Sequence, residues 1–177
     1  MDTFFEKIVP IKKTPLQFAL QLSVAIFSAA VMFVLFVFII SHAMAELTMF
    51  LAVGVAALGY GAWRIITSFN VEYEYSLTNG YLDVDKIIAQ RKRKRVLATR
   101  IKDLEAFGRY DAAKLENRRF ETRVMAGNRG AENLWFAEMN TEKTGHTLLV
   151  FEPDDRILEA IKKDLPRIVA SAAFPKE

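Results

Sequence analysis

Charged residues are almost absent from one long segment of this chain and abundant in the rest. Residues 16–63 contain a single formal charge, Glu46, whereas residues 64–177 contain 21 Lys or Arg and 18 Asp or Glu. A fully soluble globular chain does not separate its charges in this way, and a disordered or fibrous chain lacks such long apolar runs. The sequence therefore predicts an integral membrane protein with a charged domain outside the membrane.

Two apolar runs within this segment are long enough to cross a bilayer as helices. They cover residues 16–40 and 47–66, and a helix needs about 20 apolar residues to span the ~30 Å hydrocarbon core. Only a tight turn fits between them, so we expect an antiparallel helical hairpin over 16–66. A cleaved signal peptide is the alternative for the first run, but that run is far longer than the roughly 7–15 apolar residues of such a peptide.

Basic residues flank this hairpin on one side only. Lys7, Lys12 and Lys13 precede the first run, Arg64 lies at the end of the second, and the turn contains no Lys or Arg. By the positive-inside rule, both termini and the charged domain are expected to be cytoplasmic. Residues 1–15 mix apolar residues with lysines and contain two prolines, so we expect a segment that lies in the membrane interface.

Small residues of the second apolar run are candidates for helix packing. Small residues four apart share one face of a helix and let two backbones approach closely. The favoured interpretation is packing against the first helix, and the alternative is an interface between two copies of the chain. These residues are Ala52, Ala56, Ala57 and Gly61.

The period of the apolar pattern changes after the hairpin. Residues 71–77 alternate apolar and polar side chains, which indicates a half-buried strand, and Asn79-Gly80 predicts a two-residue type I′ turn. Apolar periodicity predicts an amphipathic helix near the end of the chain, with Pro153 in its first turn. Further extended segments are expected at 81–88, 91–95, 96–107, 120–126, 134–140 and 146–151, the helix at 153–165, and a loose tail at 169–177.

A block of basic residues is the most prominent feature of this domain. Residues 86–102 contain eight Lys or Arg and no acidic residue. If Ala89-Gln90 is a two-residue turn, Lys94 lies opposite Asp85 and beside Glu74. Lys86, Arg93 and Arg95 then share the other face of the sheet.

Two interpretations of this block compete. In the favoured one, the basic strand is structural: its charges offset acidic residues on the neighbouring strands and enforce the membrane topology. In the other, it docks on anionic lipid, because each basic residue near an anionic surface contributes about 1 kcal/mol. The lipid-binding candidates are Lys86, Arg91, Lys92, Arg93, Lys94 and Arg95.

Trp135 and Phe136 form an aromatic pair on a predicted strand and are candidates for contact with a protein partner. Adjacent residues of a strand point to opposite faces, so one of the two can be exposed while the other is buried. An exposed Trp135 would favour partner binding. A buried Trp135 would leave the basic block as the main surface feature.

Several classes of function lack their residues. The chain has no cysteine and only two histidines, His42 and His146, far apart in the sequence, which argues against a metal centre and against thiol chemistry. No phosphate-binding glycine loop or nucleophile elbow is present. We therefore expect no enzyme, no cofactor and no small-molecule substrate. A net charge of only +3 argues against nucleic acid as a partner.

Three stretches carry a resemblance to a known family: Tyr75-Ser-Leu-Thr-Asn-Gly80, the basic strand, and Phe151-Glu-Pro153. Together they resemble uncharacterised bacterial membrane proteins with two transmembrane helices and a pleckstrin-homology-like (PH-like) domain. The resemblance covers most of residues 5–168 and implies a fold and a place in the cytoplasmic membrane, but no reaction.

The predicted fold is thus a membrane helical hairpin plus a cytoplasmic α+β PH-like domain over residues 67–168. This domain is expected to be an antiparallel, partly open β-barrel with one C-terminal amphipathic helix. The predicted function is a non-enzymatic scaffolding, regulatory or interaction module whose partners are the bilayer and a protein or a second copy. The alternative is an anionic-lipid docking or sensing domain, and an accessory subunit of a small transporter or channel is less favoured.

Overall fold

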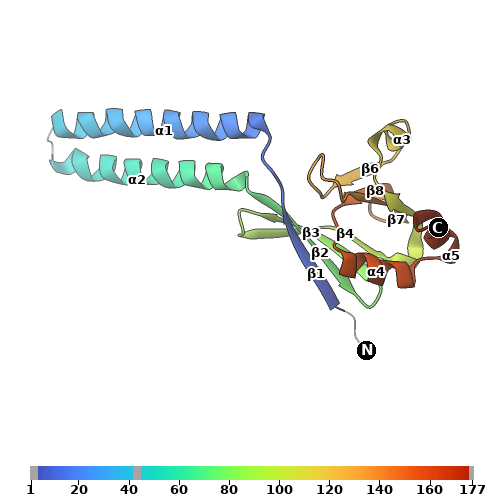
Figure 1. The fold of residues 1–177 in the computed structure, drawn as a ribbon. Helices are drawn as coiled ribbons and strands as arrows, with labels where there is room; N and C mark the ends of the chain where they lie inside the picture. The colour runs from blue at the N-terminus through green and yellow to red at the C-terminus, as the bar shows by residue number, and fades with distance from the viewer. Residues whose placement is uncertain (1–3, 42–44, 176–177) are drawn as a thin grey trace. The chain divides into compact units, whose positions relative to one another are not determined.

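The computed structural model describes residues 4–41 and 45–175 (Figure 1). The chain forms two compact units, one comprising Lys12–Val71 and the other comprising Met1–Ile11 together with Glu72–Glu177. The first unit is therefore an insertion between two segments of the second.

Two long apolar helices make up the inserted unit. α1 spans Pro15–Ser41 and α2 spans Ala45–Ser68, against predicted limits of 16–40 and 47–66. Their 27 and 24 residues correspond to lengths of about 40 and 36 Å at 1.5 Å per residue. Both helices are long and apolar enough to cross a membrane. The predicted turn, with His42, falls mostly outside the described residues.

Polar side chains order the open end of this helical hairpin. The backbone N–H of Gln17 donates to Thr14 Oγ1 (3.3 Å), and the backbone N–H of Thr14 donates to Gln17 Oε1 (3.0 Å). This reciprocal pair is a capping box at the start of α1. Gln21, only 8% exposed, donates from Nε2 to the carbonyl of Ile66 at 2.7 Å. The first turns of α1 are thereby bonded to the last turns of α2.

The first sheet of the other unit has four strands in the order β1-β2-β3-β4. Asn79 and Gly80 both have positive φ angles, 49° and 79°, so the two-residue turn predicted between β2 and β3 is confirmed. The first strand was not predicted. The strands are β1 (Phe4–Pro10), β2 (Val71–Thr78), β3 (Tyr81–Ile88) and β4 (Lys92–Arg100).

The N-terminal segment was expected to lie in the membrane interface. In the structure it forms β1, a strand of the first sheet. It pairs antiparallel with β2 over seven positions, from Phe4 opposite Thr78 to Pro10 opposite Glu72. Val9 is 5% exposed and belongs to the main core, and Lys7 Nζ donates to the carbonyl of Glu152 at 2.7 Å. The segment before the membrane helices is thus integral to the domain that follows them.

The second sheet has four strands in the order β5-β7-β8-β6, and its β6–β8 pair is parallel. The segment expected to run extended from 96 to 107 is interrupted by a 3₁₀ turn, Ile101–Asp103, at which the chain passes from the first sheet to the second. A short helix, α3 (Ala112–Glu116), precedes β6. The strands are β5 (Leu104–Arg109), β6 (Thr122–Met125), β7 (Trp135–Thr141) and β8 (Gly145–Phe151).

Two helices end the chain. α4 spans Asp155–Asp164, and the side chain of Asp154 caps it by accepting from the backbone N–H of Ile157 at 2.9 Å. Pro153 therefore lies before the helix and not in its first turn. The predicted loose tail is wrong in part, because Arg167–Ala173 forms α5 and packs against β5.

The two sheets enclose a main core and do not close into a full barrel. Tyr75 of the first sheet lies edge-on against Phe151 of the second, with ring centroids 5.5 Å apart, and α4 and α5 contribute Ile157, Ile161 and Val169. A second group of buried residues, here called the outer cluster, packs separately from this core. It consists of Leu115, Leu134, Leu148 and Val150.

Candidate functional site

The tip of the β3–β4 hairpin carries most of the basic block. Its loop has three residues, Ala89–Arg91, because the first cross-strand pair is Ile88 with Lys92. Ala89 and Gln90 both have a φ of 54°, a left-handed conformation that side chains other than Gly adopt uncommonly. Gln90 Nε2 donates to Glu72 Oε1 at 3.2 Å, which places the tip beside the start of β2.

The loop length corrects the predicted strand register. A two-residue turn would place Lys94 opposite Asp85, but the three-residue loop places Arg95 there and pairs Lys86 with Lys94. A register shift between Val84 and Asp85 then places buried residues opposite each other further along, Val84 with Leu97 and Leu82 with Thr99. Because side chains alternate along a strand, shifting the register by one residue moves each basic residue of β4 to the opposite face of the sheet relative to β3.

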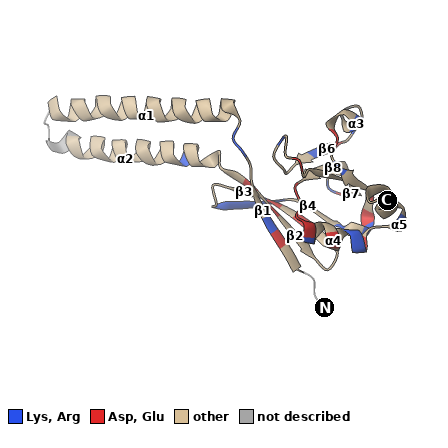
Figure 2. Cartoon of the chain, in the orientation of Figure 1, with Lys and Arg blue, Asp and Glu red and all other residues tan. Residues whose placement is uncertain are grey.

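The arginines of the block pair with acidic residues of β2 and β3, and Figure 2 marks basic and acidic positions along the strands of the first sheet. Arg93 forms an ion pair with Glu74, and its Nε lies 4.0 Å from Asp85 Oδ2. Arg95 Nε lies 3.5 Å from Asp85 Oδ1, and its Nη2 lies 3.8 Å from Asp83 Oδ2. The charge compensation predicted for this strand is therefore confirmed for two arginines, although the predicted partners were wrong.

Glu74 and Asp85 are unusual among these acids because they are buried, at 5% and 9% exposure. Burial raises the pKa of Glu74, since it penalises the charged carboxylate, while the neighbouring Arg93 opposes this rise and Glu6 and Asp85 add to it. Arg93 is thus held by a buried carboxylate, which limits its availability to an external ligand.

Three lysines lie on the opposite face of the hairpin. Lys86 shares a face with the core residue Val84, two positions away, and its cross-strand partner is Lys94. Lys92 pairs with Ile88 on that same face. Among the residues that the structure describes, no carboxylate forms an ion pair with any of the three. Like charges placed directly opposite each other destabilise a sheet, so this arrangement favours an external anion.

The basic tip, defined here as Lys86, Lys92 and Lys94 around the loop Ala89–Arg91, lies at a particular end of the first sheet. β3 ends there, and Gln90 of the loop bonds Glu72 near the start of β2. Glu72 also pairs with Pro10 at the end of β1. Both connections between this sheet and the helices α1 and α2 therefore leave from the end that carries the basic tip.

The aromatic pair predicted as a protein contact is not an exposed patch. Trp135 is 5% exposed and lies in the main core, with its ring centroid 5.1 Å from that of Phe107 and 5.3 Å from that of Phe174. Phe136 is half-buried and packs against the outer cluster. Because Trp135 is buried, the basic block is left as the main surface feature.

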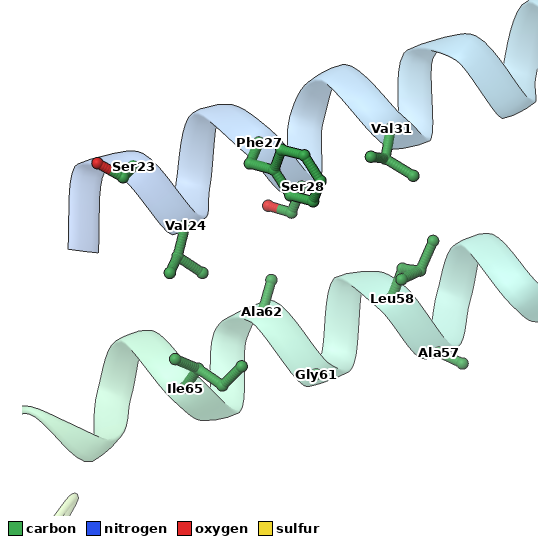
Figure 3. A pocket seen from close by; sticks show the side chains of 10 residues that line it. All are labelled: Ser23, Val24, Phe27, Ser28, Val31, Ala57, Leu58, Gly61, Ala62 and Ile65. Atoms are coloured by element: carbon green, nitrogen blue, oxygen red, sulfur yellow. The ribbon is translucent and has the colours of Figure 1, made fainter. Parts of the chain in front are cut away.

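The small residues of α2 predicted for helix packing are exposed or uncrowded. Ala52, Ala56 and Ala57 are exposed, and a Cβ added at Gly61 would meet nothing within 4 Å. Gly59 of α2 lies close to α1, since a Cβ added there would be 3.6 Å from Met32 Sδ. Ala57 and Gly61 instead line an apolar groove of ≈780 Å³ between the two helices, together with side chains of α1 (Figure 3).

In residues 4–41 and 45–175, no group of three or more His, Asp or Glu side chains is placed to hold a metal ion. The ring of His146 packs on that of Phe120 at 4.9 Å, and its Nε2 lies 3.8 Å from Glu105 Oε2. The contact between His146 of β8 and Glu105 of β5 joins two strands at the surface of the second sheet.

Comparison with known proteins identifies the family. No curated protein and no solved structure matches the chain. Its sequence does match the family described as Bacterial PH-like domain (DUF6106) over residues 1–171, a range that includes β1, both apolar helices and the two sheets. The chain therefore belongs to this bacterial PH-like family.

Proposed function

We propose that this protein is a non-enzymatic PH-like module anchored in the bacterial cytoplasmic membrane, and that its basic tip docks on anionic lipid headgroups. The lysine-free and arginine-free turn between the apolar helices supports a cytoplasmic position for the domain. The cytoplasmic leaflet carries the anionic lipids that such a tip would bind.

The position of the basic tip in the sheet carries this proposal. Only two residues separate the end of α2 at Ser68 from the start of β2 at Val71. An extended chain spans about 3.3–3.6 Å per residue, so this connection reaches about 11 Å at most. Glu72, the next residue, accepts the hydrogen bond from Gln90 in the tip. A two-residue connection and one hydrogen bond thus tie the loop of the basic tip to the end of α2.

The three lysines also supply the required charge. Each basic residue near an anionic surface contributes about 1 kcal/mol, so Lys86, Lys92 and Lys94 together contribute about 3 kcal/mol. That energy corresponds to a factor of about 150 between docked and undocked states. The arginines add less, because Arg93 and Arg95 are already paired with acidic side chains. A scaffolding or regulatory role then follows from a domain held in a fixed orientation on the bilayer.

A fluorescence experiment on the full chain tests this docking. The chain contains no cysteine, so Ala89→Cys provides a single labelling site at the tip and keeps the hydrogen bond between Gln90 and Glu72. The labelled protein is placed in nanodiscs that contain quencher-bearing lipid headgroups, either in neutral lipid or in a mixture with phosphatidylglycerol. We expect stronger quenching in anionic than in neutral nanodiscs and a loss of this difference at about 1 M salt, where the Debye length is about 3 Å.

Matched variants separate the tip from the net charge. Changing Lys86, Lys92 and Lys94 to Gln should abolish the lipid-dependent quenching. Changing the exposed residues Lys102, Lys143 and Arg167 to Gln removes the same charge elsewhere and should preserve it. Equal quenching in both kinds of nanodisc, or equal loss in both triple variants, would overturn lipid docking and leave a protein partner as the alternative for this domain.

A further inference from the structure

A second cavity lies in the extramembrane unit, away from the basic tip. Its volume is ≈580 Å³, within the range of about 300–1,000 Å³ that is usual for small-molecule sites. It opens beside the outer cluster, where α3, β6 and the segment between β6 and β7 meet. Its lining consists of Tyr110, Ala112, Arg123, Met125, Arg129, Gly130 and Leu134.

The floor of this cavity is apolar. Leu134 is 6% exposed and belongs to the outer cluster, and Met125 and Tyr110 are half-buried against that cluster. These side chains continue the packed interior of the domain into the cavity. The floor therefore suits a small hydrocarbon group.

The polar part of the lining is positively charged. Arg123 and Arg129 both line the cavity, and the lining contains no Asp or Glu. Arg123 is held in place, because its Nη2 donates to the carbonyls of Leu115 (3.1 Å) and Arg118 (2.7 Å), and its guanidinium lies 5.2 Å from the ring centroid of Phe120. These contacts fix the orientation of the Arg123 guanidinium at the cavity.

Arg129 differs from Arg123 in its surroundings. It is exposed, and within the described part of the chain no ion pair or hydrogen bond engages its side chain. It precedes Gly130, which has a φ of 83°, so the backbone turns immediately after it. One guanidinium is thus fixed at this cavity while the second is available to a ligand.

We propose that this cavity binds a small amphiphilic anion, in which a phosphate or carboxylate is joined to a short apolar group. The planar fork of a guanidinium matches both oxyanions and binds them through two parallel hydrogen bonds. The oxyanion would lie between Arg123 and Arg129, with the hydrocarbon group over Met125 and Leu134. This site shares no residue with the basic tip, so it is independent of the proposed lipid docking.

Methionine-methyl NMR of the full chain in neutral-lipid nanodiscs tests this site, because Met125 lies in the cavity floor. The spectrum is assigned with a Met125→Leu variant, and the probes are hexyl phosphate, hexanoate, inorganic phosphate and 1-hexanol. We expect hexyl phosphate to shift the Met125 signal saturably and more strongly than 1-hexanol, which lacks the charge. A further arm places phosphatidate in the nanodisc, and a Met125 shift there without added probe would identify a membrane lipid as the source of the oxyanion.

Two variants address the two parts of the site. Arg129→Gln should weaken hexyl phosphate binding about tenfold or more, because it removes a charged donor pair, whereas Arg167→Gln, an exposed arginine on α5, should not change it. Ala112→Trp should block binding by filling the cavity without altering charge. Unchanged affinity in Arg129→Gln, equal effects of hexyl phosphate and 1-hexanol, or the absence of any saturable Met125 shift in the folded wild-type protein would overturn the proposal.

Discussion

β1 is expected to be required for the stability of the domain that contains the two sheets, although α1 and α2 separate it from the remaining strands. Two soluble fragments test this requirement. The first contains residues 71–175 alone. The second joins residues 4–11 to residues 71–175 through Asn-Gly, a dipeptide suited to a two-residue hairpin turn. This link is short enough because Pro10 and Glu72 are already opposite each other in the sheet.

The contribution of β1 follows from its contacts. Burial of Val9, which is 5% exposed, contributes about 1.5–3 kcal/mol. The hydrogen bond from Lys7 Nζ to Glu152 contributes about 1.5–3 kcal/mol, because its donor is charged. The backbone bonds to β2 are offset by the entropy of ordering the strand. The total of about 3–6 kcal/mol is a large part of the 5–15 kcal/mol that stabilises a typical domain.

Urea unfolding measures this difference directly. Both fragments lack Trp63, so Trp135 is their only tryptophan, and its buried contacts with Phe107 and Phe174 make its fluorescence a probe of the core. With a dependence of about 1–3 kcal/mol per M urea, we expect the fragment without β1 to unfold at least about 1 M earlier, or to be unfolded already in buffer. Coincident unfolding curves for the two fragments would refute the assigned role of β1.

Two further predictions concern buried polar groups of β2. Tyr75→Phe removes a hydroxyl that donates to the carbonyl of Ala126 at 2.5 Å, so the free energy of unfolding of the full chain in detergent should fall by about 1–3 kcal/mol. Tyr81→Phe, at an exposed position of β3, should change it by less than about 0.5 kcal/mol, and equal urea midpoints for the two variants would contradict this assignment. Because burial raises the pKa of Glu74, the folded chain holds that proton more tightly than the unfolded chain, and stability from this group is lost as pH rises through the raised pKa. The stability of Glu74→Gln relative to wild type should therefore increase as pH rises above the ordinary pKa of a Glu side chain. A difference in unfolding free energy that is constant with pH would argue against it.

Features set by local sequence were predictable. The apolar runs identify both helices because length and hydropathy alone decide whether a helix can span a bilayer. Asn79-Gly80 identifies the first turn of the sheet because few other dipeptides accept positive φ at both positions. The compensation between the arginines and the acids was predictable in kind, since both signs lie on adjacent strands.

Features that depend on contacts between distant parts of the sequence were not predictable. In β1, the inward positions include Lys7, whose amine reaches a backbone carbonyl, so apolar alternation does not mark this strand. The loop after β3 has Ala89 and Gln90 at positive φ, and neither residue type signals that conformation. The extra loop residue moved Lys94 away from Asp85. The exposure of Ala52, Ala56 and Ala57 depends on which face of α2 meets α1, and small residues do not determine that choice.

The helical hairpin occupies the position that a β-turn has in other sheets, and this has a consequence for how the domain forms. During synthesis β1 emerges about 60 residues before β2, and closing a flexible loop of that length costs about 3.6 kcal/mol in chain entropy beyond a constant term. Once α1 and α2 are inserted, with Gln21 bonded to Ile66, the two ends of the loop are held together before the strands meet. Bilayer insertion would then be a folding step of the domain that contains the two sheets. A chain that failed to insert would leave β2 as an unpaired edge, open to aggregation.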